Sequence, residues 1–424
     1  MAYPYYTEPT HDQGIVASSA GNASRTTATS AAEGRLIVDA ADKIMLLEPN
    51  KHPLVSLLTN VGKVYDGKAW KGSGMMKQAA GNPEFAWFED FYGGRYAAVN
   101  MGGGYAASGA ITITVDGAGA DSAYIFTVGD VIKNAVSGEN MLVATVASNV
   151  TITIAAAGRG FGSTAAAAGV DDDGLFIVGN VSEENSGARN VNTTRSAKVT
   201  NYTQIFKTSI TVSGTEREAN LYGGKDLTYL RAKMGTQHAL DIERAFWWGE
   251  KKLDVTGTQG HPRRATGGIL EWIASSGAYT QNESGSALTV AEFNTFLREG
   301  FTYGNDTKYL FTGGLILQYI NEFARAQIQM KPLATSYGIK IGTWVTAFGT
   351  IHIVHNPLFV QDYAGTAFLI DMECVKYRYM NNRDTKLFTN VQSPDVDGEI
   401  DQYVSEVGLQ RMHAAKCAYL YGVV

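Results

Sequence analysis

The sequence is poor in charge and in cysteine. Charged residues make up 18% of the 424 residues, and the formal net charge is −6. A protein that wraps duplex DNA needs many Lys and Arg side chains to neutralise phosphates, so this composition argues against that function. Cys374 and Cys417 are the two cysteines, too few for a disulfide framework. Their apolar neighbours predict buried thiols in a protein of a reducing compartment.

Long hydrophobic runs and targeting segments are also missing. No apolar run reaches the roughly 18 residues that a membrane-spanning helix needs. The first residues, MAYPYYTEPTHDQ, have neither a basic start nor an apolar stretch, so we expect no secretory signal peptide.

Glycine and tyrosine are abundant, and the chain is long. Its 47 glycines and 22 tyrosines are typical of β structure and of surfaces that contact other proteins. Single hydrophobic cores stop growing at about 250–300 residues, so a chain of 424 residues should form two or more domains.

The longest helical pattern covers residues 225–250, and we call the helix that it predicts the spine helix. Charged residues interrupt the pattern, so we expect the helix to pack against sheets and not to cross a membrane. His238 lies on the apolar face and is interpreted as a core histidine with hydrogen-bond partners. Side chains at steps of three and four residues form that face: Leu227, Leu230, Met234, His238, Ile242, Ala245 and Phe246.

An aromatic segment without helical periodicity precedes this helix, between residues 61 and 100. Residues 199–213 alternate as a strand does and could pair with it, which would make a long two-stranded ribbon. An isolated ribbon is marginal in water, so its exposed aromatic side chains should lie on another subunit or domain. The predicted intersubunit contacts are Trp70, Phe85, Trp87, Phe88, Glu89, Phe91, Tyr92 and Arg95.

Residues 101–190 differ in composition from the segments on either side. They are rich in Gly and Ala and contain short apolar strand patterns about ten residues apart. We interpret this segment as a small β sandwich or barrel that is inserted into the extended loop.

The remaining segments complete the predicted organisation. Residues 1–35 form a polar arm, residues 36–47 a short amphipathic helix, and Pro53 begins a second short helix. Thr289 and Glu292 make a capping box at the start of a later helix, inside an α+β domain of residues 255–395. Residues 396–424 should end as an apolar strand beside the spine helix.

No motif predicts catalysis, a cofactor or a metal ion. Gly158, Gly160 and Gly162 lack the Lys that follows a phosphate-binding loop, and we interpret them as a turn. His352 and His355 are three apart in a strand, so they point to opposite faces and cannot chelate one ion. A Cys–His nucleophile would require a tertiary contact.

Three consecutive carboxylates, residues 171–173, could bind calcium through their oxygens. They lack the EF-hand spacing and its terminal Glu, so a solvated turn is the preferred interpretation.

Five sequence phrases stand out, in chain order: FAWFED at 85–90, FTVGDVI at 126–132, GENMLV at 138–143, NYTQIFKTSITVSGT at 201–215 and DIERAFWWG at 241–249. With these phrases in this order, the chain resembles the tailed-phage major capsid proteins with the Hong Kong 97 fold, in the branch that has a β domain in the extended loop.

The resemblance implies an α+β fold with named parts and a structural function. The parts would be an N-terminal arm (1–35), a peripheral domain start and extended loop (36–100), the inserted β domain (101–190), the loop return and spine helix (191–254), an axial domain (255–395) and a C-terminal peripheral strand (396–424). Copies would form hexamers and pentamers of an icosahedral shell around double-stranded DNA.

The resemblance also implies partners and a location. Scaffolding, portal and minor capsid or cement proteins are expected, without a membrane, a cofactor or sequence-specific DNA binding. The protein would be made in the host bacterial cytoplasm and end in the virion capsid. The alternatives are a phage tail or host-attachment protein and a nanocompartment shell that encloses cargo.

Overall fold

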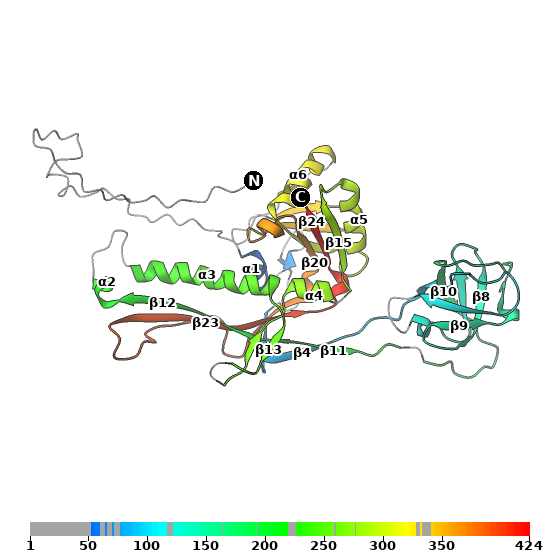
Figure 1. The fold of residues 1–424 in the computed structure, drawn as a ribbon, viewed down its shortest axis with the longest axis horizontal. Coiled ribbons are helices and arrows are strands. Elements are labelled where there is room, and N and C mark those ends of the chain that lie inside the picture. The colour runs from blue at the N-terminus through cyan, green and yellow to red at the C-terminus, as the bar shows by residue number, and fades with distance from the viewer. Residues whose placement is uncertain are drawn as a thin grey trace, which may run out of the picture.

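The computed structural model describes most of the chain from residue 52 onward (Figure 1). The predicted arm and the predicted helix at 36–47 lie outside the described residues. The residues that the structure describes are 52–59, 64–65, 70–71, 77–116, 122–162, 164–191, 193–218, 226–257, 260–275, 277–327, 331–332 and 341–424.

The spine helix, α3 (Asp226–Trp248), lies along a long antiparallel strand pair (Figure 1). Strand β12 (Gln204–Ser213) pairs with β23 (Gly398–Arg411) over its whole length, from Gln204 opposite Val407 to Ser213 opposite Gly398. The sheet order is β12-β23-β21-β3, and β22 also pairs with β23. The other elements of this layer are α1 (Pro53–Thr59), β3 (Lys77–Ala80), α2 (Gly214–Glu218), β21 (Val375–Met380) and β22 (Lys386–Phe388).

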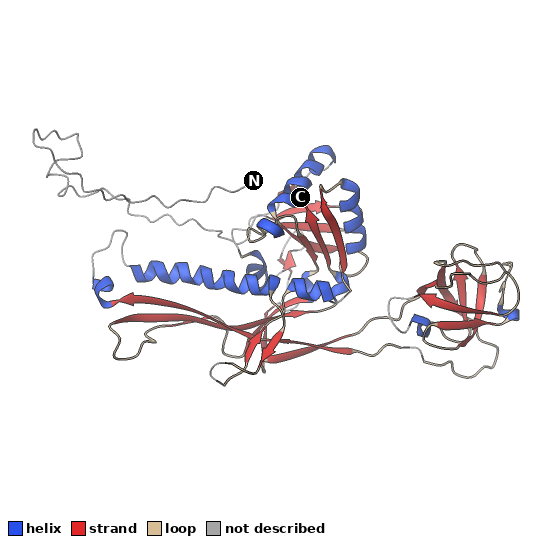
Figure 2. Cartoon of the chain, in the orientation of Figure 1, coloured by secondary structure: helices blue, strands red, loops and turns tan. Residues whose placement is uncertain are grey.

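A seven-stranded mixed sheet with helices forms the second layered body (Figure 2). Its strand order is β15-β24-β20-β16-β19-β18-β17. The strands are β15 (Tyr279–Ser286), β16 (Thr307–Thr312), β17 (Lys331–Pro332), β18 (Ile341–Val345), β19 (Thr350–His355), β20 (Ala367–Ile370) and β24 (Ala418–Val423). The helices are α4 (Ile269–Ser275), α5 (Val290–Gly300) and α6 (Gly314–Gln327).

Six strands close into a barrel that stands apart from these two sheets (Figure 2). Their order around the barrel is β10-β5-β6-β9-β8-β7, and their inward side chains make a separate hydrophobic core. The strands are β5 (Tyr96–Val99), β6 (Ile111–Asp116), β7 (Asp130–Asn134), β8 (Asn140–Val146), β9 (Thr151–Ile154) and β10 (Gly174–Asn180).

Short elements complete the described chain. Two-stranded pairs are formed by β1 (Val64–Tyr65) with β2 (Trp70–Lys71), by β4 (Glu84–Glu89) with β11 (Ala197–Tyr202), and by β13 (Lys252–Asp254) with β14 (Arg263–Ala265). The 3-10 turns are η2 (Ser122–Ile125), η3 (Ala156–Gly158), η4 (Gln361–Tyr363), η5 (Met372–Cys374) and η6 (Ala414–Lys416).

Several local predictions are confirmed because local chemistry decides them. The segment with the helical period forms α3. Pro53 begins α1, a position where the backbone N–H that proline lacks would make no hydrogen bond within the helix. Thr289 accepts from the Glu292 N–H, and the Glu292 carboxylate accepts from the Thr289 N–H, so the capping box is present. The α+β class is confirmed.

Two strand assignments differ from the prediction. Residues 199–213 do not all pair with the aromatic segment, because only β11 does so and β12 pairs with β23. The last strand, β24, lies between β15 and β20 in the seven-stranded sheet and is not beside the spine helix. Both errors concern partners far away in sequence, which alternation of side chains does not identify.

Candidate intersubunit interface

The strand pair β4–β11, which we call the ribbon, links the body of the molecule to the barrel (Figure 1). Glu89 lies opposite Ala197, and Glu84 lies opposite Tyr202. Alternation along β4 separates two faces. Phe85 and Trp87 point to one face and are each 6% exposed, whereas Phe88 points to the other face and is 71% exposed.

The inward face of the ribbon packs on β23 at a glycine. A Cβ atom at Gly408 would lie 2.9 Å from Cε1 of Phe85 and 2.6 Å from the carbonyl oxygen of Tyr202. The missing side chain therefore lets the Phe85 ring and the β11 backbone approach β23 closely. The base of the ribbon is thus part of the folded body of this chain.

We expect Gly408→Ala to destabilise the protein by about 1–3 kcal/mol, because the added methyl group overlaps a backbone atom that cannot rotate away. Thermal unfolding followed by tryptophan fluorescence would measure the effect near Trp87. Gly179→Ala is the matched control, since a Cβ atom there meets nothing within 4 Å. Equal unfolding temperatures for the two variants would contradict the packing described here.

Polar contacts hold the same junction. Nε1 of Trp87 donates to Oε1 of Glu89 at 2.7 Å, and the backbone N–H of His413 donates to the same oxygen at 3.1 Å. Asn201 on β11 is fully buried, and its Nδ2 donates to the Leu409 carbonyl at 2.7 Å and to the Gly267 carbonyl at 3.1 Å. The ribbon therefore leaves the body in a fixed direction.

The exposed aromatic side chains begin where the ribbon leaves the body. Phe91 is 70% exposed and Tyr92 is 100% exposed, and Phe88 on the outward face precedes them. Arg95, just before the barrel, is also exposed. Isolated exposed aromatics are common, but three within five residues on a projecting element form a patch typical of a protein contact.

Three of the predicted contact residues have contacts within their own chain. Phe85 and Trp87 pack within their own chain, because strand alternation places them on the face that covers β23. Glu89 is half-buried and has internal hydrogen bonds. The backbone of Trp70 lies in β2, but its side chain lies outside the described part. Among the predicted contact residues whose side chains the structure describes, the exposed ones form the candidate interface: Phe88, Phe91, Tyr92 and Arg95. The contact predicted for Trp70 stays a prediction.

A buried carboxylate at the centre of the body was missed by the sequence analysis. Glu243 on α3 is completely buried and accepts four hydrogen bonds, from two other parts of the chain and from its own helix. The donors are the Leu54 N–H at 3.0 Å, the Val55 N–H at 2.7 Å, Nε1 of Trp247 at 2.9 Å and Nδ2 of Asn356 at 3.4 Å. It joins α1, the spine helix and the loop after β19.

Burial dominates the protonation of Glu243. Removal from water raises the pKa of this carboxyl group to about 7, although its hydrogen bonds act in the opposite direction. A signal in the sequence could have identified the residue: it lies one turn before Trp247 and next to Ile242, on the flank of the apolar face. A charge at that position has to be buried with partners.

The other predicted core groups are buried in the body. Nε2 of His238 lies 2.6 Å from Oγ of Ser405, and its Nδ1 lies 2.9 Å from Oγ1 of Thr208, which confirms a core histidine with partners. Cys374 and Cys417 are buried free thiols, and burial raises the pKa of Cys417 to about 12. A thiol with so high a pKa is a poor nucleophile at neutral pH.

The barrel contains a second polar network that the sequence analysis missed. Nε of Arg159 donates to Oε1 of Glu139 at 2.7 Å, and Nη2 donates to Oε2 at 2.9 Å. Their side chains are 2% and 0% exposed. The flanking Gly160 and Gly162 have φ angles of +57° and +87°, as expected for the predicted turn.

The carboxylates at residues 171–173 take part in hydrogen bonds within the barrel. Oδ1 of Asp171 accepts from the Met101 N–H at 2.6 Å, and Oδ2 of Asp173 accepts from Nδ2 of Asn134 at 2.9 Å. Asp172 adopts the left-handed conformation, with a φ angle of +66°. Within the residues that the structure describes, no group of three His, Cys, Asp or Glu side chains could hold a metal ion.

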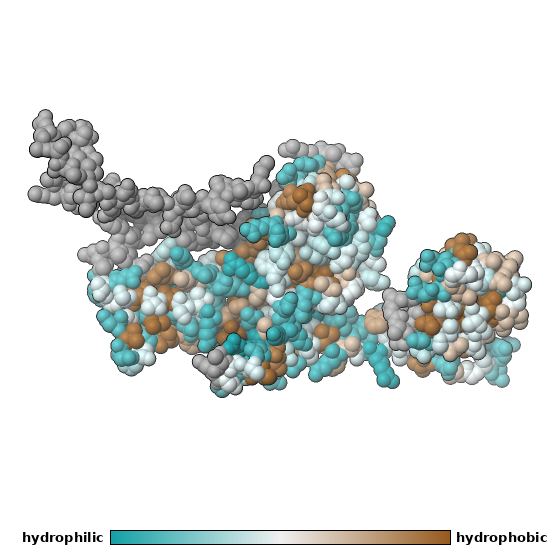
Figure 3. All heavy atoms as spheres, in the orientation of Figure 1, coloured by the Kyte–Doolittle hydropathy of each residue, from teal (hydrophilic) through white to brown (hydrophobic). Residues whose placement is uncertain are grey.

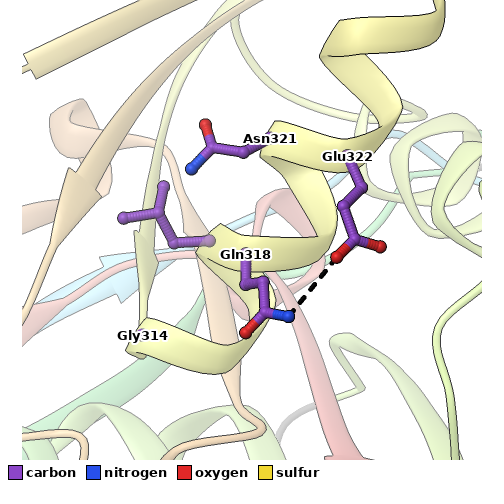
Figure 4. Close-up of a pocket in the computed structure, with 5 residues that line it drawn as sticks. Gly314, Gln318, Asn321 and Glu322 are labelled. Carbon is purple, nitrogen blue, oxygen red and sulfur yellow. Dashed lines mark hydrogen bonds between the residues drawn. The ribbon is translucent and has the colours of Figure 1, made fainter.

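A depression on α6 offers no constellation of converging polar groups (Figure 4). A single helix lines it, through Gly314, Leu317, Gln318, Asn321 and Glu322. Nε2 of Gln318 donates to Oε1 of Glu322 at 3.3 Å on the same helix. Among the helices of the described ranges, none is both long and apolar enough to cross a membrane.

Comparisons with known proteins were made for the whole chain. The family model described as the SU10 major capsid protein matches residues 20–423. The major capsid protein of Pseudomonas phage PaMx41 is 24% identical over 344 residues, which cover 75% of this chain and 80% of that protein.

Similar solved structures include a cyanophage capsid and an encapsulin. The capsid asymmetric unit of cyanophage A-1(L) is 9% identical with a TM-score of 0.41, and the match covers 57% of this chain and 85% of the other. The SrpI encapsulin from Synechococcus elongatus PCC 7942 is 10% identical with a TM-score of 0.39, and the match covers 54% and 76% of the two chains.

Proposed function

The chain belongs to the family of the SU10 major capsid protein, and from that premise we propose how its copies assemble into the shell. As a phage major capsid protein it is a structural component of the virion capsid, with the Hong Kong 97-type fold that the sequence predicted. The proposal is that hexamers and pentamers close an icosahedral shell around double-stranded DNA, with the ribbon of each copy lying on its neighbour.

The aromatic patch of the ribbon is the observation that carries this proposal. Phe88, Phe91 and Tyr92 are 71%, 70% and 100% exposed on an element that projects from the body. Burying three such side chains on a neighbouring copy would remove several hundred Å² from water in all, since aromatic residues bury about 150–250 Å² each. Arg95 lies beside the patch and adds a charged group to its rim.

The parts of the molecule receive roles in this proposal. The layer of α3, β12 and β23 acts as the peripheral domain, and the seven-stranded sheet with α5 and α6 acts as the axial domain at the centre of each capsomer. The barrel is the domain inserted in the extended loop. Scaffolding, portal and minor capsid or cement proteins would complete assembly, which begins in the host cytoplasm. The composition, with a net charge of −6, suits a shell that does not bind the phosphates of the enclosed DNA tightly.

The tail-protein and nanocompartment alternatives are not favoured by the family match. The match runs from residue 20 to residue 423, so it includes the spine helix, the ribbon and both sheets. The family consists of structural capsid proteins.

Replacing Phe88, Phe91 and Tyr92 together by serine tests the role of the ribbon. We expect folded subunits that no longer form capsomers or shells, because the intersubunit contact loses its aromatic anchors. Electron microscopy and light scattering would measure assembly, and circular dichroism would show that the subunit is folded.

The control for this variant changes equally exposed apolar side chains on the barrel. Val136→Ser and Val178→Ser alter residues that are 73% and 62% exposed, away from the ribbon. We expect shells from this double variant. Wild-type protein that forms neither rings nor shells under any condition would refute the proposed assembly, and normal shells from the triple variant would refute the role of the ribbon.

A further inference from the structure

We propose that the hairpin β13–β14 of one copy docks on the far end of the β12–β23 strand pair of another copy. This inference rests on the proposed function, since it names a second contact between copies in the shell. We call the two surfaces the hairpin and the tip. The tip comprises residues 214–218 and 386–399, and the hairpin comprises the described parts of residues 251–265.

The tip presents apolar side chains inside an acidic rim. Phe388, Val391 and Val396 are 48%, 47% and 44% exposed. Phe388 pairs with Gln402 of β23, and the Val391 N–H donates to the Ile400 carbonyl of the same strand. The whole tip contains five acidic residues and two basic residues, and one of the five, Glu399, forms an ion pair with Arg231. A Cβ atom added to Gly214 would overlap the Asp397 carboxylate, so the two segments lie against each other. Brown apolar and teal polar atoms alternate on this end of the molecule in Figure 3.

The hairpin presents the complementary surface. Leu253 and Val255 are 43% and 68% exposed. Leu253 and Arg264 are paired across the hairpin, so their side chains lie on the same face. Residues 251–264 contain four basic residues and one acidic residue. The hairpin is therefore basic around an apolar centre, whereas the tip is acidic around an apolar centre. An apolar core with a polar rim of matching charge is the usual anatomy of a specific interface.

The two surfaces lie at opposite ends of one strand. The Thr266 N–H, next to the hairpin, donates to the Gln204 side chain at the start of β12. Ser213, at the other end of β12, pairs with Gly398 in the tip. Ten residues of strand separate the surfaces by roughly 30 Å, so they cannot meet within one chain.

A contact between different surfaces of identical copies has a geometric consequence. Each copy offers one tip and one hairpin, so each can bind two neighbours head to tail. Contacts of this kind close into rings when the rotation between copies is suitable. The occupant of each surface is therefore a second copy of this chain, and not an unrelated protein.

Charge reversal with rescue tests the contact in the full-length protein. The tip variant carries Glu216→Lys and Asp395→Lys, and the hairpin variant carries Lys252→Glu and Arg264→Glu. Each should lower the assembled fraction by about tenfold or more, because like charges then face each other across the contact. The variant with all four substitutions keeps the net charge of −6 and should assemble as the wild type does.

The matched control reverses two exposed charges in the loop that follows the barrel, by Glu183→Lys and Glu184→Lys, and should assemble normally. Assembly of both two-site variants at wild-type levels would overturn this inference but not the proposed function. Failure of the four-site variant to assemble, although circular dichroism shows it folded, would do the same. Wild-type protein that never assembles would instead refute the proposed function.

The salt dependence of assembly tests the contact without substitutions. Raising the ionic strength from about 0.1 to about 1 M shortens the Debye length from about 10 to 3 Å and should lower the assembled fraction.

Discussion

Replacing Glu243 by alanine is expected to destabilise the protein by about 3–5 kcal/mol. The carboxylate accepts from the Leu54 and Val55 N–H groups, from Nε1 of Trp247 and from Nδ2 of Asn356. Alanine leaves these buried donors without an acceptor, and each unsatisfied donor costs about 1–3 kcal/mol. The substitution also leaves a cavity between α1 and the spine helix.

Denaturant unfolding of the unassembled subunit would measure this loss. Asp241→Ala on the same helix is the matched control, because the Asp241 side chain is 42% exposed and pairs with Arg244 at the surface. Surface pairs of this kind contribute about 0–1 kcal/mol. An effect of Glu243→Ala no larger than that of Asp241→Ala would show that Glu243 does not hold α1 on the spine helix.

The pH dependence of stability gives a second readout for the same residue. The pKa of Glu243 is about 7 in the folded protein and about 4.5 in the unfolded chain, so the folded state holds the proton more tightly. This contribution to stability is therefore complete below about pH 4.5, declines as the pH rises to about 7, and is then lost. Its size is of the order of 3 kcal/mol. The neutral Glu243→Gln variant should lack this decline between pH 5 and 7.

Prediction from the sequence succeeded where neighbouring residues determine the structure. The helical period gave the spine helix within two residues at each end, and Pro53, Thr289 and Glu292 marked helix starts through their own hydrogen-bonding properties. Alternating apolar residues located strands of the barrel. The strand that opens the barrel, Tyr96–Val99, was included in the extended loop, because four residues carry little periodic signal.

Prediction failed where the outcome depends on packing between distant segments. Phe85 and Phe88 are alike in the sequence, but one faces Gly408 from the end of the chain and the other faces solvent. The position of Gly408 could not be connected with Phe85 without the fold. Glu243 was counted among charges that interrupt an apolar run, because its four donors come together only in the folded chain.

The barrel should lose its fold when Arg159 is replaced by alanine, while the rest of the protein stays folded. Glu139 would then be an unpaired charge with a fully buried side chain, which costs about 3–5 kcal/mol. The Arg159 guanidinium also donates to the carbonyl oxygens of Ala106 and Ala167, so its loss frees two loops from the barrel end. Burial is the largest influence on the pKa of Glu139 and raises it, but the hydrogen bonds from Arg159, Ala167 and Gly160 together lower the pKa.

The loss should be confined to the barrel because its core shares no buried side chain with the other cores. Limited proteolysis with mass spectrometry should find new cleavages between residues 96 and 180 in Arg159→Ala, and an intact spine helix. Lys133→Ala, an exposed change on a barrel strand, should be cleaved as the wild type is. Replacing both Arg159 and Glu139 by methionine should restore part of the protection, since no buried charge then remains unpaired. Equal protection of Arg159→Ala and the wild type would mean that the ion pair does not hold the barrel together.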